Sequence, residues 1–171
     1  PEEVARAFDY LKDSGKVRNF GVSNQNPYQM QLLQNSLDMP LCANQLQFGV
    51  MHTPMIQSGI NVNMYNESGV NRDGSVLDYC RLNKITIQPW SPMQYGFFEG
   101  CFVDNDKFPE LNKKLGEIAE KYNIDLEASY AYGDTSGDYT MLKMVGHPFA
   151  INPTRELLAK IKEEFNKATG K

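Results

Sequence analysis

Short apolar runs typical of strands alternate with amphipathic segments along the chain, and this alternation constrains the fold more than any other feature. Strand patterns occur at residues 17–24, 41–48, 85–90, 128–133 and 148–151. The segments around them carry apolar residues at helical spacing, and one opens with Asn26 as a cap before Pro27. Such alternation favours a parallel sheet. Five strands are too few to close an eight-stranded barrel, so we expect an open α/β sheet.

Residues 49–74 interrupt this alternation. The stretch is rich in Gly, Asn, Ser and Met and shows no sustained period. A loop of this length is uncommon in a compact domain and is usually functional or poorly ordered. We therefore expect it to be the least ordered part of the chain, with fast amide hydrogen exchange.

Length, charge and cysteine content restrict the class of protein. A chain of 171 residues is long enough for a single domain with a full core, which we assign to residues 1–171. The net charge of -4 and the lack of a long apolar run give no reason to expect nucleic-acid or membrane partners. Cys42, Cys80 and Cys101 show no CxxC spacing, which favours packing thiols in a reducing compartment. We expect a cytoplasmic monomer that is soluble when produced recombinantly.

Three motifs carry a resemblance to a known family. They are SGKVRNFGVSNQNPYQMQLL, CANQLQF and LDYCRLNKITIQPWSPM, in this order. Residues 1 to about 127 thereby resemble the second half of an aldo-keto reductase, a (βα)₈ barrel enzyme that uses NADPH. The resemblance implies that Ser23, Asn24 and Gln45 contact the nicotinamide carboxamide. It also implies that an aromatic residue stacks on the nicotinamide ring, here Trp90 where Tyr is commoner, although a lone Trp at a strand end is more often simply packed.

The first half of that barrel supplies the family's catalytic Tyr, Lys, Asp and His, and these motifs do not include it. Without a Tyr acid whose pKa is lowered by Lys, no group can protonate a developing alkoxide. The family's eighth strand and its adenosine-phosphate loop are also replaced. We therefore expect the nicotinamide contacts to be vestigial, with no bound cofactor and no enzyme activity.

From about residue 125 the sequence resembles a second family. The run YAYGDTSGDYTML within residues 128–171 is similar to the fourth motif of haloacid dehalogenase-like (HAD) phosphatases. The resemblance implies that Asp134 and Asp138 are vestigial Mg²⁺ ligands. The family's DxDxT nucleophile loop is absent, and two carboxylates alone bind Mg²⁺ weakly. The alternative is structural: Asp138 caps the following helix and Asp134 accepts backbone N–H groups.

A final helix start at residues 152–155 is a candidate anion site. Thr154 and Arg155 would hold a phosphate or sulfate against the backbone N–H groups of the first turn. The alternative is that these residues only cap the helix. Adventitious metal or anion binding is the only ligand binding that we expect.

The two resemblances together predict a sheet order. We expect a three-layer Rossmann-like, HAD-like sheet of five parallel strands in the order 5-4-1-2-3, with Asn24 and Asp134 as neighbours at the switch point. Pro89, which lacks an N–H, favours an edge position for the third strand. The rival order is a fan, 1-2-3-4-5, which would leave one face of the sheet under-covered.

These expectations suggest three classes of function. The first is an engineered chimera, a de novo scaffold without an intact active site, made from fragments of two folds. The second is a residual module that binds Mg²⁺, an anion or a nucleotide at the switch point. The third is a weak oxidoreductase or phosphatase.

Overall fold

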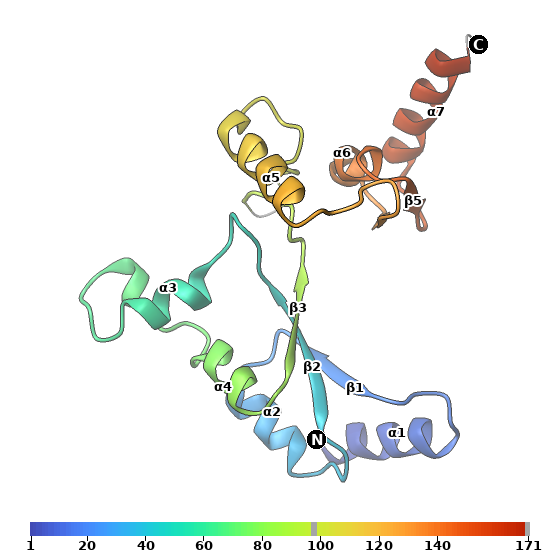
Figure 1. Cartoon of the computed structure of the whole chain (residues 1–171). Coiled ribbons are helices and arrows are strands. Elements are labelled where there is room, and N and C mark those ends of the chain that lie inside the picture. Colours follow the sequence, from blue (N-terminus) through green and yellow to red (C-terminus); the bar gives the residue numbers. More distant parts are fainter. Residues whose placement is uncertain (97–98, 170–171) are drawn as a thin grey trace. The chain divides into compact units, whose positions relative to one another are not determined.

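The computed structural model describes residues 1–96 and 99–169 and divides into two compact units (Figure 1). Unit 1 comprises Pro1–Pro92 and unit 2 comprises Met93–Lys171. Each unit is described below by itself. The expectation of one domain, with a change of resemblance near residue 127, therefore stays a prediction.

Unit 1 is built on a parallel sheet of three strands in the order β1-β2-β3. The strands are β1 (Phe20–Ser23), β2 (Leu41–Gln47) and β3 (Thr86–Trp90). Strand β3 lies at an edge of this sheet, the position that Pro89 predicts because a proline cannot donate a ladder hydrogen bond.

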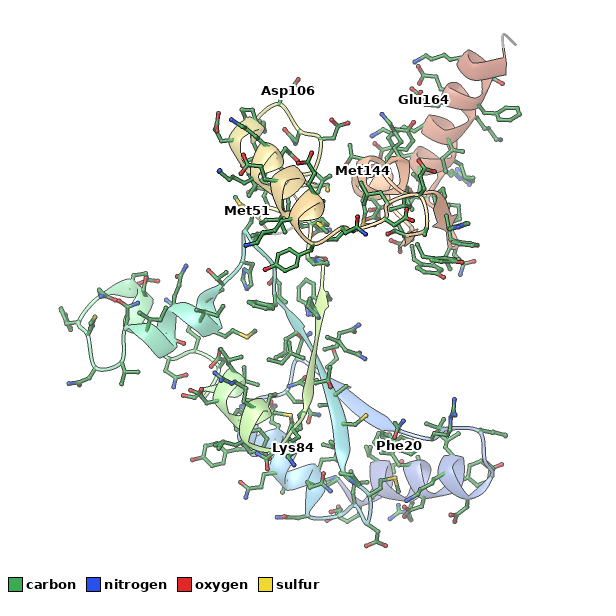
Figure 2. All side chains as sticks on the ribbon, in the orientation of Figure 1. Phe20, Met51, Lys84, Asp106, Met144 and Glu164 are labelled. Atoms are coloured by element: carbon green, nitrogen blue, oxygen red, sulfur yellow. The ribbon has the colours of Figure 1, made fainter. Side chains whose placement is uncertain are left out.

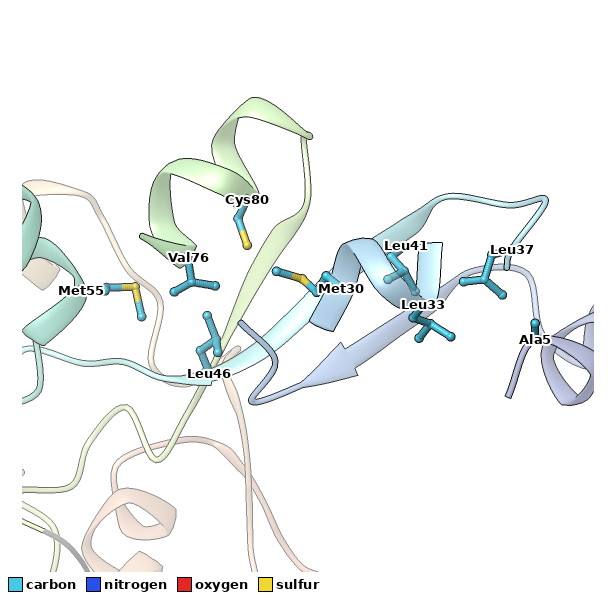
Figure 3. Close-up of a cluster of buried hydrophobic side chains, with 9 residues drawn as sticks. All are labelled: Ala5, Met30, Leu33, Leu37, Leu41, Leu46, Met55, Val76 and Cys80. Atoms are coloured by element: carbon cyan, nitrogen blue, oxygen red, sulfur yellow. The ribbon is translucent and has the colours of Figure 1, made fainter. Parts of the chain in front are cut away.

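The helices of unit 1 pack their apolar side chains against one face of this sheet. They are α1 (Glu2–Asp13), α2 (Pro27–Gln34), α3 (Pro54–Ile60) and α4 (Val76–Leu82). Figure 3 shows the buried cluster, in which Met30 of α2 and Cys80 of α4 are fully buried beside Leu46 of β2. Phe20, labelled in Figure 2, stacks on Phe8 of α1 with ring centroids 4.3 Å apart.

The other face of the sheet is polar and open. Val22, Leu46 and Ile87 pack with the apolar cluster, and side chains of a strand alternate between the two faces. The residues next to them, Ser23, Gln45 and Gln88, are exposed and lie opposite one another in register. Parallel sheets are normally covered on both faces, so this polar face differs from the usual pattern.

The stretch at 49–74 contains more regular structure than the sequence indicates. It includes α3 and a 3₁₀ helix, η1 (Glu67–Gly69). Pro54 occupies the first turn of α3, and Met55 buries its side chain in the core cluster. Helices this short cover at most two turns, so they leave no sustained apolar period in the sequence.

Unit 2 contains a two-stranded parallel sheet of β4 (Tyr130–Gly133) and β5 (His147–Ala150). Its helices are α5 (Pro109–Lys121), the 3₁₀ helix η2 (Ser136–Asp138), α6 (Tyr139–Lys143) and α7 (Arg155–Thr169). Ala131, Leu142 and Leu157 form a buried cluster between the sheet and helices α6 and α7. A separate cluster joins Phe102 and Val103 to α5.

The five-stranded order 5-4-1-2-3 is not confirmed. Among the described residues the strands form two open sheets, and β1 and β4 each pair with one neighbour only. The neighbours within each sheet, 1-2-3 and 4-5, occur both in that order and in the fan order, so they do not distinguish the two. The Rossmann-like, HAD-like three-layer sheet is likewise not confirmed. An α/β architecture with open parallel sheets is what the structure shows.

No helix within the described parts of the chain has the length and apolar character that a membrane span requires.

Candidate functional site

The predicted nicotinamide contacts meet at the carboxyl end of the sheet in unit 1. Ser23 ends β1 and lies opposite Gln45 of β2, while Trp90 ends β3 and lies opposite Gln47. The carboxyl ends of parallel strands are the usual place for ligands in α/β sheets. The structure thus brings together the four residues that the resemblance assigns to the nicotinamide, within unit 1.

Backbone and side-chain hydrogen bonds hold Ser23 and Asn24 against β2. The Asn24 N–H donates to the Gln45 carbonyl oxygen at 2.9 Å, and the Ser23 hydroxyl donates to the same oxygen at 3.2 Å. Asn24 has a φ of 54°, in the left-handed region that Asn tolerates better than most residues. This conformation ends β1 and turns the chain towards α2.

Trp90 makes a hydrogen bond that the sequence did not predict. Its indole Nε1 donates to Asn24 Oδ1 at 3.0 Å, although the two residues are 66 positions apart. The Trp90 side chain is half-buried, whereas Asn24 is exposed. The sequence alternatives for Trp90 were ring stacking and simple packing, and the observed bond is compatible with both.

Asn44 is a functional candidate that sequence reasoning missed. It is fully buried, and its Nδ2 donates to the Gln25 carbonyl oxygen at 2.8 Å. Its Oδ1 and the Gln25 Oε1 are both buried without a hydrogen-bond partner. The signal in the sequence is its place two residues before Leu46, on the strand face that packs into the core.

An open depression of about 600 Å³ lies on the polar face of the sheet. Gly21, Ser23, Ala43, Gln45 and Gln88 contribute to its lining. Gly21 is required there, because a Cβ atom at this position would lie 2.8 Å from the Ala43 carbonyl oxygen. Neutral hydroxyl and amide groups can donate to and accept from a carboxamide, so these residues fit the nicotinamide end of a cofactor.

Ser23, Asn24, Gln45 and Trp90 are not acids or bases in the ordinary pH range. They can orient a ligand by hydrogen bonding, but they cannot exchange a proton with it. The buried thiol of Cys80 lies in the core cluster, where burial raises its pKa above the ordinary value. The arrangement is therefore suited to binding and orientation.

The Asp138 carboxylate closes the turn after β4. Its Oδ2 accepts hydrogen bonds from the Asp134 N–H at 3.2 Å, the Thr135 N–H at 3.0 Å and the Thr135 hydroxyl at 2.9 Å. Thr135 is the N-cap of η2 and forms a capping box with Asp138, whereas the Asp138 side chain makes no capping bond to α6. The structural alternative from the sequence assigned Asp138 as the cap of α6 and Asp134 as the acceptor of backbone N–H groups. In the structure, Asp138 accepts the backbone N–H groups.

These residues do not form a complete Mg²⁺ ligand set. Within residues 1–96 and 99–169, no group of three or more His, Cys, Asp or Glu side chains is arranged to hold a metal ion. Mg²⁺ prefers six oxygen ligands, and one of the four carboxylate oxygens here already accepts three hydrogen bonds. Mg²⁺ binding by Asp134 and Asp138 stays a prediction.

Thr154 caps α7, and Arg155 is the first residue of that helix. The Thr154 hydroxyl accepts from the Leu157 N–H at 3.3 Å. The Thr154 backbone N–H donates to the Asp134 carbonyl oxygen at 2.8 Å. Asn152 has a φ of 45°, and α7 begins at Arg155, the last residue of the helix start predicted at 152–155. Anion binding at Thr154 and Arg155 stays a prediction.

Comparison with known proteins shows the family. A family model described as "Aldo/keto reductase family" matches residues 1–139. Oxidoreductase YdhF of Escherichia coli (strain K12) is 33% identical over 122 residues, which are 71% of this chain and 34% of that protein. Uncharacterized oxidoreductase YcsN of Bacillus subtilis (strain 168) is 30% identical over 139 residues, which are 80% of this chain and 41% of that protein. The chain belongs to the aldo/keto reductase family.

A second family model, described as a haloacid dehalogenase-like hydrolase, matches residues 111–169. The two matches overlap at residues 111–139, a range that contains the boundary predicted near residue 127. They are consistent with a chain of two parts.

The interpretation of the chain as an engineered scaffold is wrong. The two relatives above are named as oxidoreductases. A further relative is 6-dehydroglucose reductase of Agrobacterium fabrum (strain C58 / ATCC 33970). It is 29% identical over 102 residues, which are 59% of this chain and 29% of that protein. The chain spans less than half the length of these curated relatives. These findings place the chain among relatives that are named as oxidoreductases and reductases.

Proposed function

We propose that this chain forms the nicotinamide-binding side of an NADPH-dependent oxidoreductase. The observation that carries the proposal is the meeting of Ser23, Asn24 and Gln45 at the carboxyl ends of β1 and β2. Their neutral hydrogen-bonding groups match the carbonyl and amino groups of a carboxamide. The oxidoreductase names of the relatives support the same class of reaction.

Residues 1–171 alone bind the cofactor in this proposal but do not reduce a substrate. The four site residues supply no proton to a developing alkoxide, and the family's Tyr acid belongs to a part of the barrel that these residues do not resemble. An absorbance assay with NADPH and a reactive aromatic aldehyde tests this point. Turnover clearly above that of a heat-denatured sample would contradict it.

The binding proposal is tested by calorimetric titration with NADPH and with reduced nicotinamide mononucleotide. Because the adenosine-phosphate loop of the family is replaced here, we expect similar affinity for the two ligands. Gln45→Ala should weaken both by about fivefold, as expected for the loss of one hydrogen bond. Gln31→Ala, at an exposed position of α2, is the matched control and should bind like the wild type. No binding by the wild type, or equal binding by Gln45→Ala, would contradict the proposal.

A further inference from the structure

The bond between Trp90 and Asn24 determines which way the Asn24 amide points. An asparagine side chain has an acceptor end, Oδ1, and a donor end, Nδ2, whereas the indole N–H can only donate. The 3.0 Å contact with Trp90 Nε1 must therefore involve Oδ1, and Nδ2 is left to face another partner. A rotated amide would place two donors against each other.

The backbone on both sides of the Asn24 side chain is held as well. The Asn24 N–H is bonded to the Gln45 carbonyl oxygen at 2.9 Å. The next carbonyl, that of Gln25, accepts from the buried Asn44 Nδ2 at 2.8 Å. Rotation of the side chain is then the main freedom left to Asn24, and the indole removes it.

We propose that Trp90 is a positioning residue that directs Asn24 Nδ2 to the carbonyl oxygen of the nicotinamide carboxamide. The inference rests on the proposed function, since it assigns an orientation within the same site. It leaves the amino group of the carboxamide to an acceptor other than Asn24 Oδ1. The chain should therefore discriminate between cofactors by the acceptor strength of that carbonyl group.

Cofactor analogues measure this orientation directly. The thionicotinamide analogue of NADP⁺ keeps the amino group but replaces the oxygen by sulfur, a weaker acceptor, and the wild type should bind it about fivefold more weakly than NADP⁺. Trp90→Phe keeps an aromatic ring and removes the N–H, so the Asn24 amide can rotate and offer Oδ1 to the amino group. Its preference for NADP⁺ over the thio analogue should fall to about twofold or less.

Two controls separate orientation from a general loss of structure. The 3-acetylpyridine analogue keeps the oxygen and lacks the amino group, so its penalty relative to NADP⁺ should not shrink in Trp90→Phe. Asn24→Asp keeps an acceptor for Trp90 but removes the donor, and should bind NADP⁺ about tenfold more weakly than the wild type.

The bond itself can be tested without a cofactor. Trp90 is the sole tryptophan, so the protein gives a single indole N–H signal in NMR spectra. Asn24→Ala should shift this signal and speed its exchange with water, while Gln31→Ala should leave it unchanged. An unshifted signal in Asn24→Ala would overturn the inference.

The titrations distinguish the two levels of failure. If the wild type binds NADP⁺, and a folded Trp90→Phe protein keeps the full preference for NADP⁺ over the thio analogue, the positioning role is overturned. The proposed function is then left standing. No wild-type binding of NADP⁺ or NADPH would overturn both.

Discussion

At the scale of single residues, Asn44 shows how a buried amide supports an exposed site. It has no contact with solvent, yet its one strong hydrogen bond goes to the carbonyl of Gln25, which follows Asn24. A buried polar group contributes to stability only while it is bonded, because an unmet donor or acceptor retains its full desolvation cost. Asn44 therefore links the core cluster to the loop that carries the candidate site.

Asn44→Asp should destabilise the chain strongly at pH 8, by about 3 kcal/mol or more, because it buries a charge beside the Gln25 carbonyl oxygen. Burial raises the pKa of such a carboxyl above its unfolded value, so the stability is retained at low pH and is lost as the pH rises. Asn44→Leu, of similar size, should cost about 1–2 kcal/mol at both pH values. Urea denaturation at pH 5 and pH 8 measures both variants. An Asn44→Asp protein as stable as the wild type at pH 8 would contradict the assignment.

The buried thiol of Cys80 gives a second prediction at this scale. Burial raises its pKa above the ordinary value of 9.0, so the folded state holds the proton more tightly than the unfolded state. The free energy of unfolding should therefore fall as the pH rises above about 9, and Cys80→Ala should reduce this slope.

Thiol labelling of the native protein should modify the half-buried Cys42 before Cys80. Equal labelling rates would show that the core opens readily.

At the scale of elements, the residue that caps α4 is not the serine that directly precedes the helix. Ser75 directly precedes α4, and Ser is a residue type that often caps helices, but it has a φ of 64° and its side chain makes no capping bond. Asp73 Oδ1 accepts instead from the Ser75 N–H at 2.9 Å and the Val76 N–H at 3.3 Å. The loop conformation before the helix decided which of two suitable residues caps it.

Asp73→Ala should therefore destabilise unit 1 by about 1 kcal/mol, the usual cost of losing a helix cap. Ser75→Gly should cost little or stabilise slightly, because glycine adopts a left-handed conformation without steric penalty. Chemical denaturation of both variants gives the comparison. A larger loss in Ser75→Gly than in Asp73→Ala would restore Ser75 as the cap.

At the scale of the whole molecule, the arrangement of strands is where expectation and structure differ most. Two sheets were found where one was predicted, and the match to the aldo/keto reductase family extends to residue 139, beyond the boundary near 127. The five-stranded order 5-4-1-2-3 stays a prediction. It requires Asn24 and Asp134 to be neighbours.

A protein carrying both Asn24→Cys and Asp134→Cys should form a disulfide between the new residues on mild oxidation if that order is correct. The fan order separates these positions by two intervening strands and predicts no such bond. Mass spectrometry of proteolytic peptides identifies the pairing and distinguishes it from bonds to Cys42. The single Asn24→Cys variant is the control. Recovery of both new cysteines as free thiols would argue against the order.

Much of the local structure was predictable because it depends on neighbouring residues. The five strands lie within the predicted ranges or one residue outside them, and Asn26 caps α2 through a bond with the Gln29 N–H at 3.0 Å, as its place before Pro27 predicts. The motifs around Ser23, Asn24 and Gln45 also identified the family, since they are contiguous runs of sequence.

Contacts between distant segments were decided only by the tertiary structure. The Trp90–Asn24 bond spans 66 positions and depends on the register of three strands, and the burial of Asn44 depends on which face of β2 the helices cover. Neither the Trp90–Asn24 bond nor the burial of Asn44 is encoded in a short run of residues, because each arises from the packing of elements that are separate in the chain. The sequence thus predicted which residues belong to the candidate site, and the tertiary structure determined how the Asn24 amide is directed.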